Sequence, residues 1–166
     1  MLEWDADWSG RMRIAEERGL RRYLAIFLAH SGDSWFWLSG LILLWLLGSD
    51  YWKQRAMVLG GSILVTAVVV LAIKFTVRRR RPEGDWGSIY RSTDPHSFPS
   101  GHAARTILLA TVTAGLGPVW LALILVVWAP LVALARVMMG LHYLSDVIVG
   151  AVLGLCIGLG IAIVVV

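Results

Sequence analysis

Five long apolar runs constrain the fold of this chain more than any other feature. They cover about residues 35–52, 55–77, 102–116, 118–139 and 144–166. Runs of about 20 apolar residues match the thickness of the hydrocarbon core of a bilayer, and a helix satisfies the backbone hydrogen bonds of such a run. The sequence therefore predicts an all-α, polytopic membrane helix bundle with five transmembrane spans. The third run is short, and we expect it to lie partly inside the bundle.

Composition excludes a water-soluble globule. The chain has 166 residues, of which 58% are hydrophobic and only 16% are charged, whereas soluble domains contain roughly 45–50% apolar and about 25% charged residues. The net charge of +4 comes mostly from arginines outside the apolar runs, so it does not indicate a nucleic-acid partner. Cys156 is the one cysteine, which excludes an intrachain disulfide and a cysteine metal site.

The N-terminal region, residues 1–34, differs from the membrane-embedded region, residues 35–166. Seven charged side chains fall between residues 11 and 30, and this many charges do not suit hydrocarbon. Apolar residues alternate with them, so we predict an amphipathic helix that lies at the membrane interface. A sixth span over residues 11–30 is the alternative.

Ionisable residues inside the apolar runs point to a functional site. Lys74 and Arg136 lie near the C-terminal ends of their runs, and Arg105 and Asp146 lie near the N-terminal ends of theirs. Because consecutive spans alternate in direction, all four residues come to the same membrane face. Charges in a membrane are costly, so their convergence indicates function.

The first motif places Lys74 and Arg81 seven residues apart, with Pro82 next. The two cations share a helix face if the helix continues to Arg81, and they are then suited to phosphate oxygens. For Arg79 and Arg80 the alternative is a basic anchor for anionic lipid headgroups.

The second motif is Pro99-Ser100-Gly101-His102, at the start of an apolar run. Free N–H groups at a helix start bind an oxyanion, and Gly101 allows a close approach of the backbone. His102 can then give a proton to a leaving oxygen. The alternative is an ordinary N-cap with an incidental histidine.

The third motif contains Arg136, His142 and Asp146. A carboxylate on one imidazole nitrogen fixes the tautomer and leaves the other nitrogen free as a nucleophile. The alternative is a buried polar pair that joins two helices. Glycines follow Asp146 at four-residue steps, which predicts close helix packing and turns Asp146 into the bundle. These glycines are Gly150, Gly154 and Gly158.

Together the three motifs resemble the type 2 phosphatidic acid phosphatase superfamily of membrane lipid phosphatases. The family patterns are Lys, six residues, Arg-Pro; Pro-Ser-Gly-His; and Ser-Arg, five residues, His, three residues, Asp. The chain matches them over about residues 55–166, except that Ala135 replaces the serine. The N-terminal region is a second departure, because many members have a sixth spanning helix there.

The resemblance implies a metal-independent reaction through a phosphohistidine, with no cofactor. His142 would attack phosphorus, oriented by Asp146, and His102 would protonate the leaving lipid oxygen. The phosphate oxygens would be held by Lys74, Arg81, Ser100, Gly101 and Arg136.

We therefore predict a lipid phosphatase whose partners are the bilayer and a lipid phosphate. The candidate substrates are a polyprenyl phosphate or diphosphate and a phosphatidylglycerophosphate-like lipid, and the sequence favours none of them. A non-catalytic lipid-phosphate binding or transport protein is the alternative, and a purely structural membrane protein is a third. No prediction is made about the oligomeric state.

We place the protein in the cell membrane with its site on the cytoplasmic face. Five arginines precede the first run and five lie between residues 78 and 101, against Lys53 and Arg55 on the other side. The positive-inside rule then gives the orientation.

Overall fold

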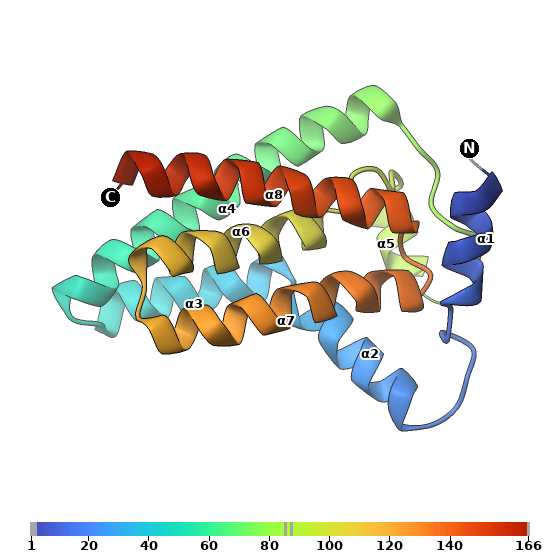
Figure 1. Ribbon diagram of the computed structural model, residues 1–166, viewed down its shortest axis with the longest axis horizontal. Coiled ribbons are helices and arrows are strands. Elements are labelled where there is room, and N and C mark those ends of the chain that lie inside the picture. The colour runs from blue at the N-terminus through green and yellow to red at the C-terminus, as the bar shows by residue number, and fades with distance from the viewer. Residues whose placement is uncertain (1–2, 85, 87, 166) are drawn as a thin grey trace.

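The five apolar runs are all helical in the computed structural model, which describes residues 3–84, 86 and 88–165. The predicted regions 1–34 and 35–166 include residues 1–2 and 166, which lie outside the described residues. The described part contains eight helices (Figure 1): α1 Glu3–Arg11, α2 Leu20–Ser31, α3 Ser34–Leu47, α4 Asp50–Val77, α5 Ser88–Thr93, α6 Gly101–Leu116, α7 Val119–Met138 and α8 Leu144–Val165. Its one extended pairing is an isolated bridge between Arg80 and His96. The all-α prediction is confirmed.

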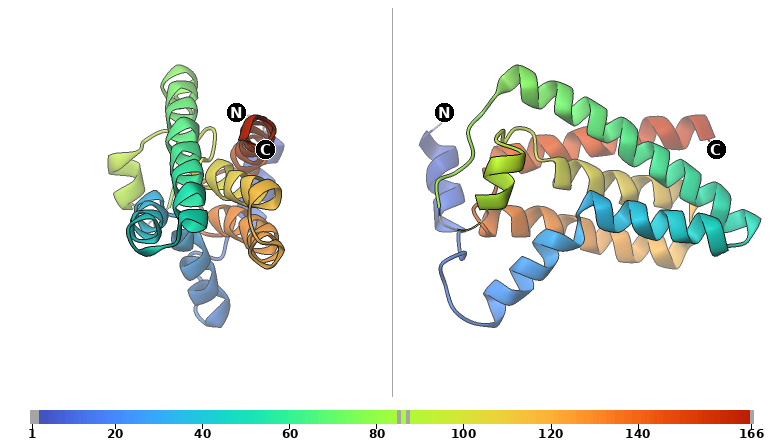
Figure 2. Two further views of the ribbon diagram at one scale, coloured as in Figure 1. Left: turned by 90° about the vertical axis from the view of Figure 1, so that its left-hand side faces the viewer. Right: turned by 180° about the vertical axis from the view of Figure 1, so that it is seen from behind.

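Helix α6 is the centre of the bundle. It packs against α4, α7 and α8, and nine of its 16 residues are buried. Helices α7 and α8 run alongside it, whereas α4 crosses the bundle at an angle and α3 packs on α4 (Figure 2). A short helix surrounded by longer ones does not need to cross the bilayer against lipid, as we expected for this run.

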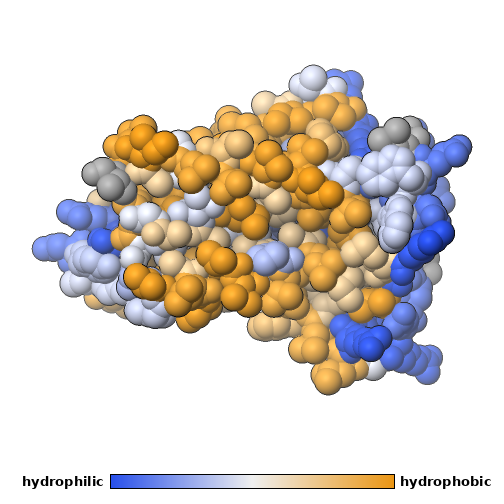
Figure 3. Space-filling view, viewed as in Figure 1, coloured by the Kyte–Doolittle hydropathy of each residue, from blue (hydrophilic) through white to orange (hydrophobic). Residues whose placement is uncertain are grey.

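Within the described residues, three helices are long and apolar enough to cross a membrane by length and composition: α4 with 28 residues, α7 with 20 and α8 with 22. Helix α3 is apolar but has 14 residues. Figure 3 shows a broad apolar surface between two polar ends, and the polar end near α1 is the larger. The structure therefore shows a helical membrane protein, and five complete spans remain a prediction.

The glycine face of α8 explains how closely α6 and α8 approach each other. A Cβ atom at Gly150 or Gly154 would overlap a backbone carbonyl oxygen of α6, that of Ser100 or Ala104, and one at Gly158 would lie 2.8 Å from the Cβ of Thr111. Small residues let two backbones meet in this way. Asp146, on the same face, is fully buried in the bundle as predicted.

Helix α4 ends at Val77, so it does not continue to Arg81. Arg78 has a left-handed backbone with φ of 53° and donates its N–H to the Lys74 carbonyl. Such a residue closes a helix by satisfying a free carbonyl group. The prediction that Lys74 and Arg81 share a helix face is therefore wrong, because Arg81 lies in the following loop.

The N-terminal region forms two helices rather than one. Helix α1 lies against the start of α8, and α2 packs on α7 while diverging from the bundle axis (Figure 1). Four large apolar side chains of α2 are more than half exposed: Leu20, Tyr23, Leu24 and Phe27. This surface suits a membrane interface, and the interfacial placement of α2 stays a prediction, as does the division at residue 34.

The α6–α8 contact gives a test of the packing. We expect Gly154→Ala to lower the free energy of unfolding by about 1–3 kcal/mol, because the new methyl group meets backbone that cannot move aside. Gly160→Ala is the matched control on the same helix, since its Cβ would meet nothing within 4 Å. Thermal unfolding of the two variants in one detergent checks this. Equal midpoints would show that α8 does not pack as described.

Candidate active site

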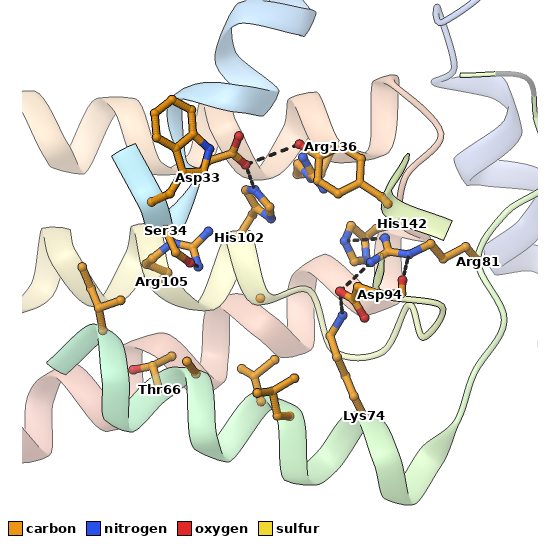
Figure 4. A pocket seen from close by; sticks show the side chains of 17 residues that line it. Asp33, Ser34, Thr66, Lys74, Arg81, Asp94, His102, Arg105, Arg136 and His142 are labelled. Carbon is orange, nitrogen blue, oxygen red and sulfur yellow. Dashed lines mark hydrogen bonds and ion pairs between the residues drawn. The ribbon is translucent and has the colours of Figure 1, made fainter. Parts of the chain in front are cut away.

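A cavity of about 410 Å³ lies near the end of the bundle that carries α1 and α5. Its wall combines apolar residues of α4 with charged residues from α6, α7 and the segments that connect the helices (Figure 4). Six of the predicted site residues line it: Lys74, Arg81, Gly101, His102, Arg136 and His142. The fold thus brings together residues from all three motifs.

Lys74 and Arg81 converge on a single carboxylate oxygen in this cavity. Asp94 Oδ2 accepts hydrogen bonds from Lys74 Nζ at 2.5 Å and from Arg81 Nη2 at 2.8 Å. Burial raises the pKa of Asp94, but the hydrogen bond and charge of Lys74 and the charge of Arg81 outweigh it and lower the pKa overall. Asp94 therefore remains an anion, and it occupies the position that a phosphate oxygen would take between the two cations.

Arg136 carries the free donors of the site. It is 0% exposed, and its Nη1 donates to the Ala29 carbonyl at 3.1 Å. Its Nε and Nη2 have no hydrogen-bond partner in the described part of the chain. The guanidinium carbon lies 4.5 Å from the centre of the Tyr90 ring. Buried donors are normally paired, so two unpaired donors on a cavity wall indicate the place of an anionic ligand.

Arg105 is committed to the protein instead. Its Nε donates to the Gly32 carbonyl at 2.9 Å, Nη2 donates to the same oxygen, and Nη1 donates to Ser34. Within the described residues, Arg105 makes no ion pair with Asp146. Unlike Arg136, it has no buried donor without a hydrogen-bond partner. Arg105 therefore joins α6 to the α2–α3 turn.

His142 lies in the loop between α7 and α8 and is 1% exposed. Its Nδ1 is 2.8 Å from the Ser97 carbonyl oxygen and 3.7 Å from Asp146 Oδ2. A carbonyl oxygen only accepts, so Nδ1 carries the hydrogen and Nε2 has the lone pair. This lone pair accepts a hydrogen bond from Arg81 Nη1 at 3.1 Å. The backbone of Ser97, rather than Asp146, makes the hydrogen bond that fixes this tautomer.

Charge also keeps His142 neutral. Burial lowers the pKa of its imidazole well below the usual value, and the charges of Arg81, Arg136 and Lys74 lower it further. A neutral ring with its lone pair on Nε2 is the form that acts as a nucleophile.

Asp146 holds the turn before α8. Its Oδ2 accepts from the Tyr143 N–H at 2.9 Å, and its Oδ1 accepts from Arg79 Nη1 at 2.7 Å. Arg79 also donates to Asp5 of α1 at 2.6 Å. The lipid-anchor interpretation is therefore wrong for Arg79, whose guanidinium is used inside the protein. Arg80 is exposed, and its side chain makes no ion pair within the described residues.

Ser100 caps α6, which is the alternative interpretation of this motif, and its predicted contact with phosphate stays a prediction. Its hydroxyl oxygen accepts from the Ala103 N–H at 3.4 Å, and its own N–H donates to the Asp146 carbonyl at 2.9 Å. The side chain of Ser100 is fully buried, and it is not among the described residues that line the cavity. Gly101, the next residue, lines the cavity with its backbone.

Sequence reasoning missed four residues that complete the site: Asp5, Asp33, Asp94 and Ser97. Asp33 Oδ1 lies 2.6 Å from His102 Nε2 (Figure 4). The available signal was electrostatic, because a cluster of buried cations requires nearby carboxylates.

A membrane helix bundle with a buried, cation-rich cavity and two histidines defines a membrane protein that binds an anion. Residues 55–166 match the PAP2 superfamily, and the chain belongs to this family. The resemblance inferred from the three motifs is confirmed, and with it the assignment as a phosphatase.

Named relatives agree with the family. A decaprenylphosphoryl-5-phosphoribose phosphatase of Mycobacterium tuberculosis is 34% identical over 135 residues, which are 79% of this chain and 73% of the relative. An undecaprenyl-diphosphatase of Sulfolobus acidocaldarius is 27% identical over 139 residues, which are 79% of this chain and 64% of the relative.

Solved structures share the fold. The PAP2-type phosphatidylglycerolphosphate phosphatase of Bacillus subtilis superposes with a TM-score of 0.75 at 20% identity, over 95% of this chain and 82% of that chain. LpxE of Aquifex aeolicus gives a TM-score of 0.68 at 27% identity, over 89% of both chains.

The position of Asp94 gives a prediction about anion binding. We expect Asp94→Asn to strengthen inhibition by inorganic phosphate about tenfold, because the carboxylate no longer competes for Lys74 and Arg81; this equals about 1.4 kcal/mol. The inhibition constant for phosphate measures the effect. Asp50→Asn, at the far end of the bundle, is the control. Weaker inhibition in the Asp94 variant would mean that Asp94 positions the cations rather than competing for them.

Proposed function

We propose that this protein hydrolyses a phosphomonoester or diphosphate of a membrane lipid through a phosphohistidine intermediate. One observation carries the proposal. Arg136 has two unpaired donors in the same buried cavity that contains the neutral, nucleophilic His142. The alternative of a lipid-phosphate binder gains no support from the site, because binding alone does not require a tautomer with Nε2 free.

In the first half of the reaction, the lone pair of His142 Nε2 forms a bond to phosphorus while the bond from phosphorus to the lipid oxygen breaks. Arg136, Lys74 and Arg81 hold the other oxygens, with Asp94 displaced from the two cations. His102 gives its proton to the leaving oxygen. Fixed cations in a dry cavity stabilise the charge of the transition state without having to reorganise.

In the second half, a water molecule gives a proton to His102 and attacks phosphorus. The bond from phosphorus to His142 breaks, and phosphate leaves with His102 again protonated. Asp146 acts on these steps indirectly, because it holds the turn that carries His142. This differs from the role that the family resemblance implies, in which Asp146 orients the imidazole itself.

The cavity wall indicates how a lipid reaches the site. Ala67, Val70 and Leu71 of α4 line the cavity together with Trp35 of α3. Trp35 is 70% exposed and Leu71 is 48% exposed on the apolar surface. A headgroup can therefore enter from the bilayer near α3 and α4 while its tail stays in lipid. The two named relatives act on decaprenyl and undecaprenyl compounds, which favours a polyprenyl chain as the tail here.

A phosphate-release assay with a polyprenyl phosphate tests the function. We expect turnover that persists in excess EDTA, and a trapped protein phosphate that is stable to base and labile to acid. His142→Ala should lose both turnover and the trapped protein phosphate, because Nε2 of His142 is the proposed attacking nitrogen beside Arg81. Arg136→Ala should lose turnover and also weaken substrate binding, since its donors act on bound phosphate.

His96→Ala is the matched control, because the ring of His96 packs on Phe75 and its backbone oxygen, which remains in the variant, is what Lys74 contacts. A His142→Ala protein that turns over at the wild-type rate would refute the nucleophile assignment, and turnover that is lost in EDTA and restored by magnesium would refute the metal-independent mechanism.

The cytoplasmic placement of the site is also a proposal. It is supported by the arginines of α1, α2 and the 78–101 loop, which lie at one end of the bundle, against Lys53 and Arg55 at the other. In a Cys156→Ala background, an impermeant thiol reagent on intact cells should label Ser49→Cys and leave Ser92→Cys unlabelled. Lysed cells serve as the control in which both are labelled. Labelling of position 92 but not 49 on intact cells would reverse the orientation.

A further inference from the structure

His102 faces an electrostatic difficulty as a general acid. It must carry a proton, and therefore a positive charge, while Arg105, Arg136 and Arg81 line the same cavity. Like charges within a buried site disfavour the cationic form of an imidazole. A nearby anion is needed to offset them, and it must remain in place while the substrate is bound.

We propose that Asp33 is the positioning residue that supplies this anion, and that it holds His102 as an oriented, protonated acid. The inference rests on the proposed function. Asp33 Oδ1 lies 2.6 Å from His102 Nε2, and the two side chains are 13% and 14% exposed. His102 Nδ1 makes no hydrogen bond within the described part of the chain, which leaves it for the leaving oxygen of the substrate.

The carboxylate of Asp33 does not cap its own helix. Asp33 occupies the N-cap position of α3, where an aspartate side chain usually accepts a hydrogen bond from the first turn of its own helix. No such bond forms here, although the backbone is in the usual extended conformation with φ of −65° and ψ of 138°. The cap geometry is thus present while the side chain is used on His102 of another helix.

The backbone around Asp33 is fixed from two sides. Arg105, one turn after His102 on α6, donates two hydrogen bonds to the Gly32 carbonyl. A Cβ atom at Gly32 would lie 2.9 Å from Val132 Cγ1 and 3.1 Å from Thr106 Cγ2, so a larger residue would push this turn away from α6 and α7. The same helix therefore carries the acid and the arginine that holds the partner of the acid in place.

Asp33 also has contacts on its outer side. Its Oδ2 lies 3.3 Å from Nδ1 of His30, and the Tyr90 hydroxyl lies 2.9 Å from that nitrogen and 3.4 Å from Asp33 Oδ1. Because Tyr90 and His30 restrain the carboxylate from outside, it is oriented before the substrate arrives. Unlike Asp94, Asp33 contacts neither Lys74 nor Arg81 in the described structure, so a phosphate bound between these cations does not displace it.

The proposed role is specific to proton transfer. In the first half of the reaction, imidazolium Nδ1 gives its proton to the oxygen that leaves phosphorus, and neutral His102 keeps its Nε2–H bond to Asp33. In the second half, Nδ1 takes a proton from water as the oxygen bonds to phosphorus and the bond to His142 breaks. Asp33 keeps its charge throughout and undergoes no bond change.

The experiment compares two leaving groups in the first turnover. An alkyl phosphate releases an alkoxide that needs a proton, whereas a lipophilic nitrophenyl phosphate releases a phenolate that does not. Release of the leaving group is measured before steady state, because the later hydrolysis of the phosphohistidine is common to both substrates. We expect Asp33→Asn to slow the alkyl substrate about 100-fold, the size of a general-acid contribution, and the aryl substrate less than about threefold.

Controls separate this result from a structural effect and from a failure of the proposed function. Asp33→Glu keeps the charge and should restore part of the alkyl rate, and Asp50→Asn should change neither rate. Equal losses on both substrates, or no loss on either, would overturn the role of Asp33. If the wild-type protein released neither leaving group, the proposed function itself would fail, whatever the variants did.

Discussion

Compensation of buried positive charge is the constraint on which the rest of this structure depends. Four cations line one cavity near the end of a membrane bundle: Lys74, Arg81, Arg105 and Arg136. Transferring one ion from water into such an interior costs several kcal/mol unless it is paired. Asp94 pairs with Lys74 and Arg81, and the Gly32 carbonyl and Ser34 accept from Arg105. Arg136 keeps two donors that have no partner among the described residues. A bound phosphate group, as proposed, would supply the charge and the hydrogen-bond acceptors that these cations still lack.

The same logic explains why the N-terminal helix belongs to the site. Asp5 of α1 is 1% exposed and accepts from Arg79, which in turn donates to Asp146. Burial raises the pKa of Asp5, but hydrogen bonds from Ser145 and Arg79 outweigh it and keep the carboxylate charged. Ser9 of α1 also accepts from the Leu144 N–H at 2.9 Å. Helix α1 thus closes the polar end of α8 and indirectly supports the loop of His142.

Hydrophobic runs and motif spacing were sufficient to predict the helices, the end of the bundle at which Lys74, Arg105 and Arg136 meet, and the two histidines beside them. The partners of those residues were not predictable in the same way. Arg79 pairs with Asp5 across 74 positions, and His102 pairs with Asp33 across 69. Such pairs depend on how the loops fold over the end of the bundle. The spacing of apolar residues along one helix does not show where a distant loop will lie. The early end of α4 at Val77 is a similar case, because it depends on one left-handed residue, Arg78.

The departure from the family pattern at Ala135 follows from the docking of α2. Ala135 is 1% exposed in an apolar cluster with Ala25 and Ala29 of α2, where a serine hydroxyl would be buried among methyl groups. Small residues on both helices allow a close approach. That approach brings the Ala29 carbonyl to within 3.1 Å of Arg136 Nη1. One donor of Arg136 is therefore held by α2, which leaves Nε and Nη2 on a fixed guanidinium plane for the phosphate.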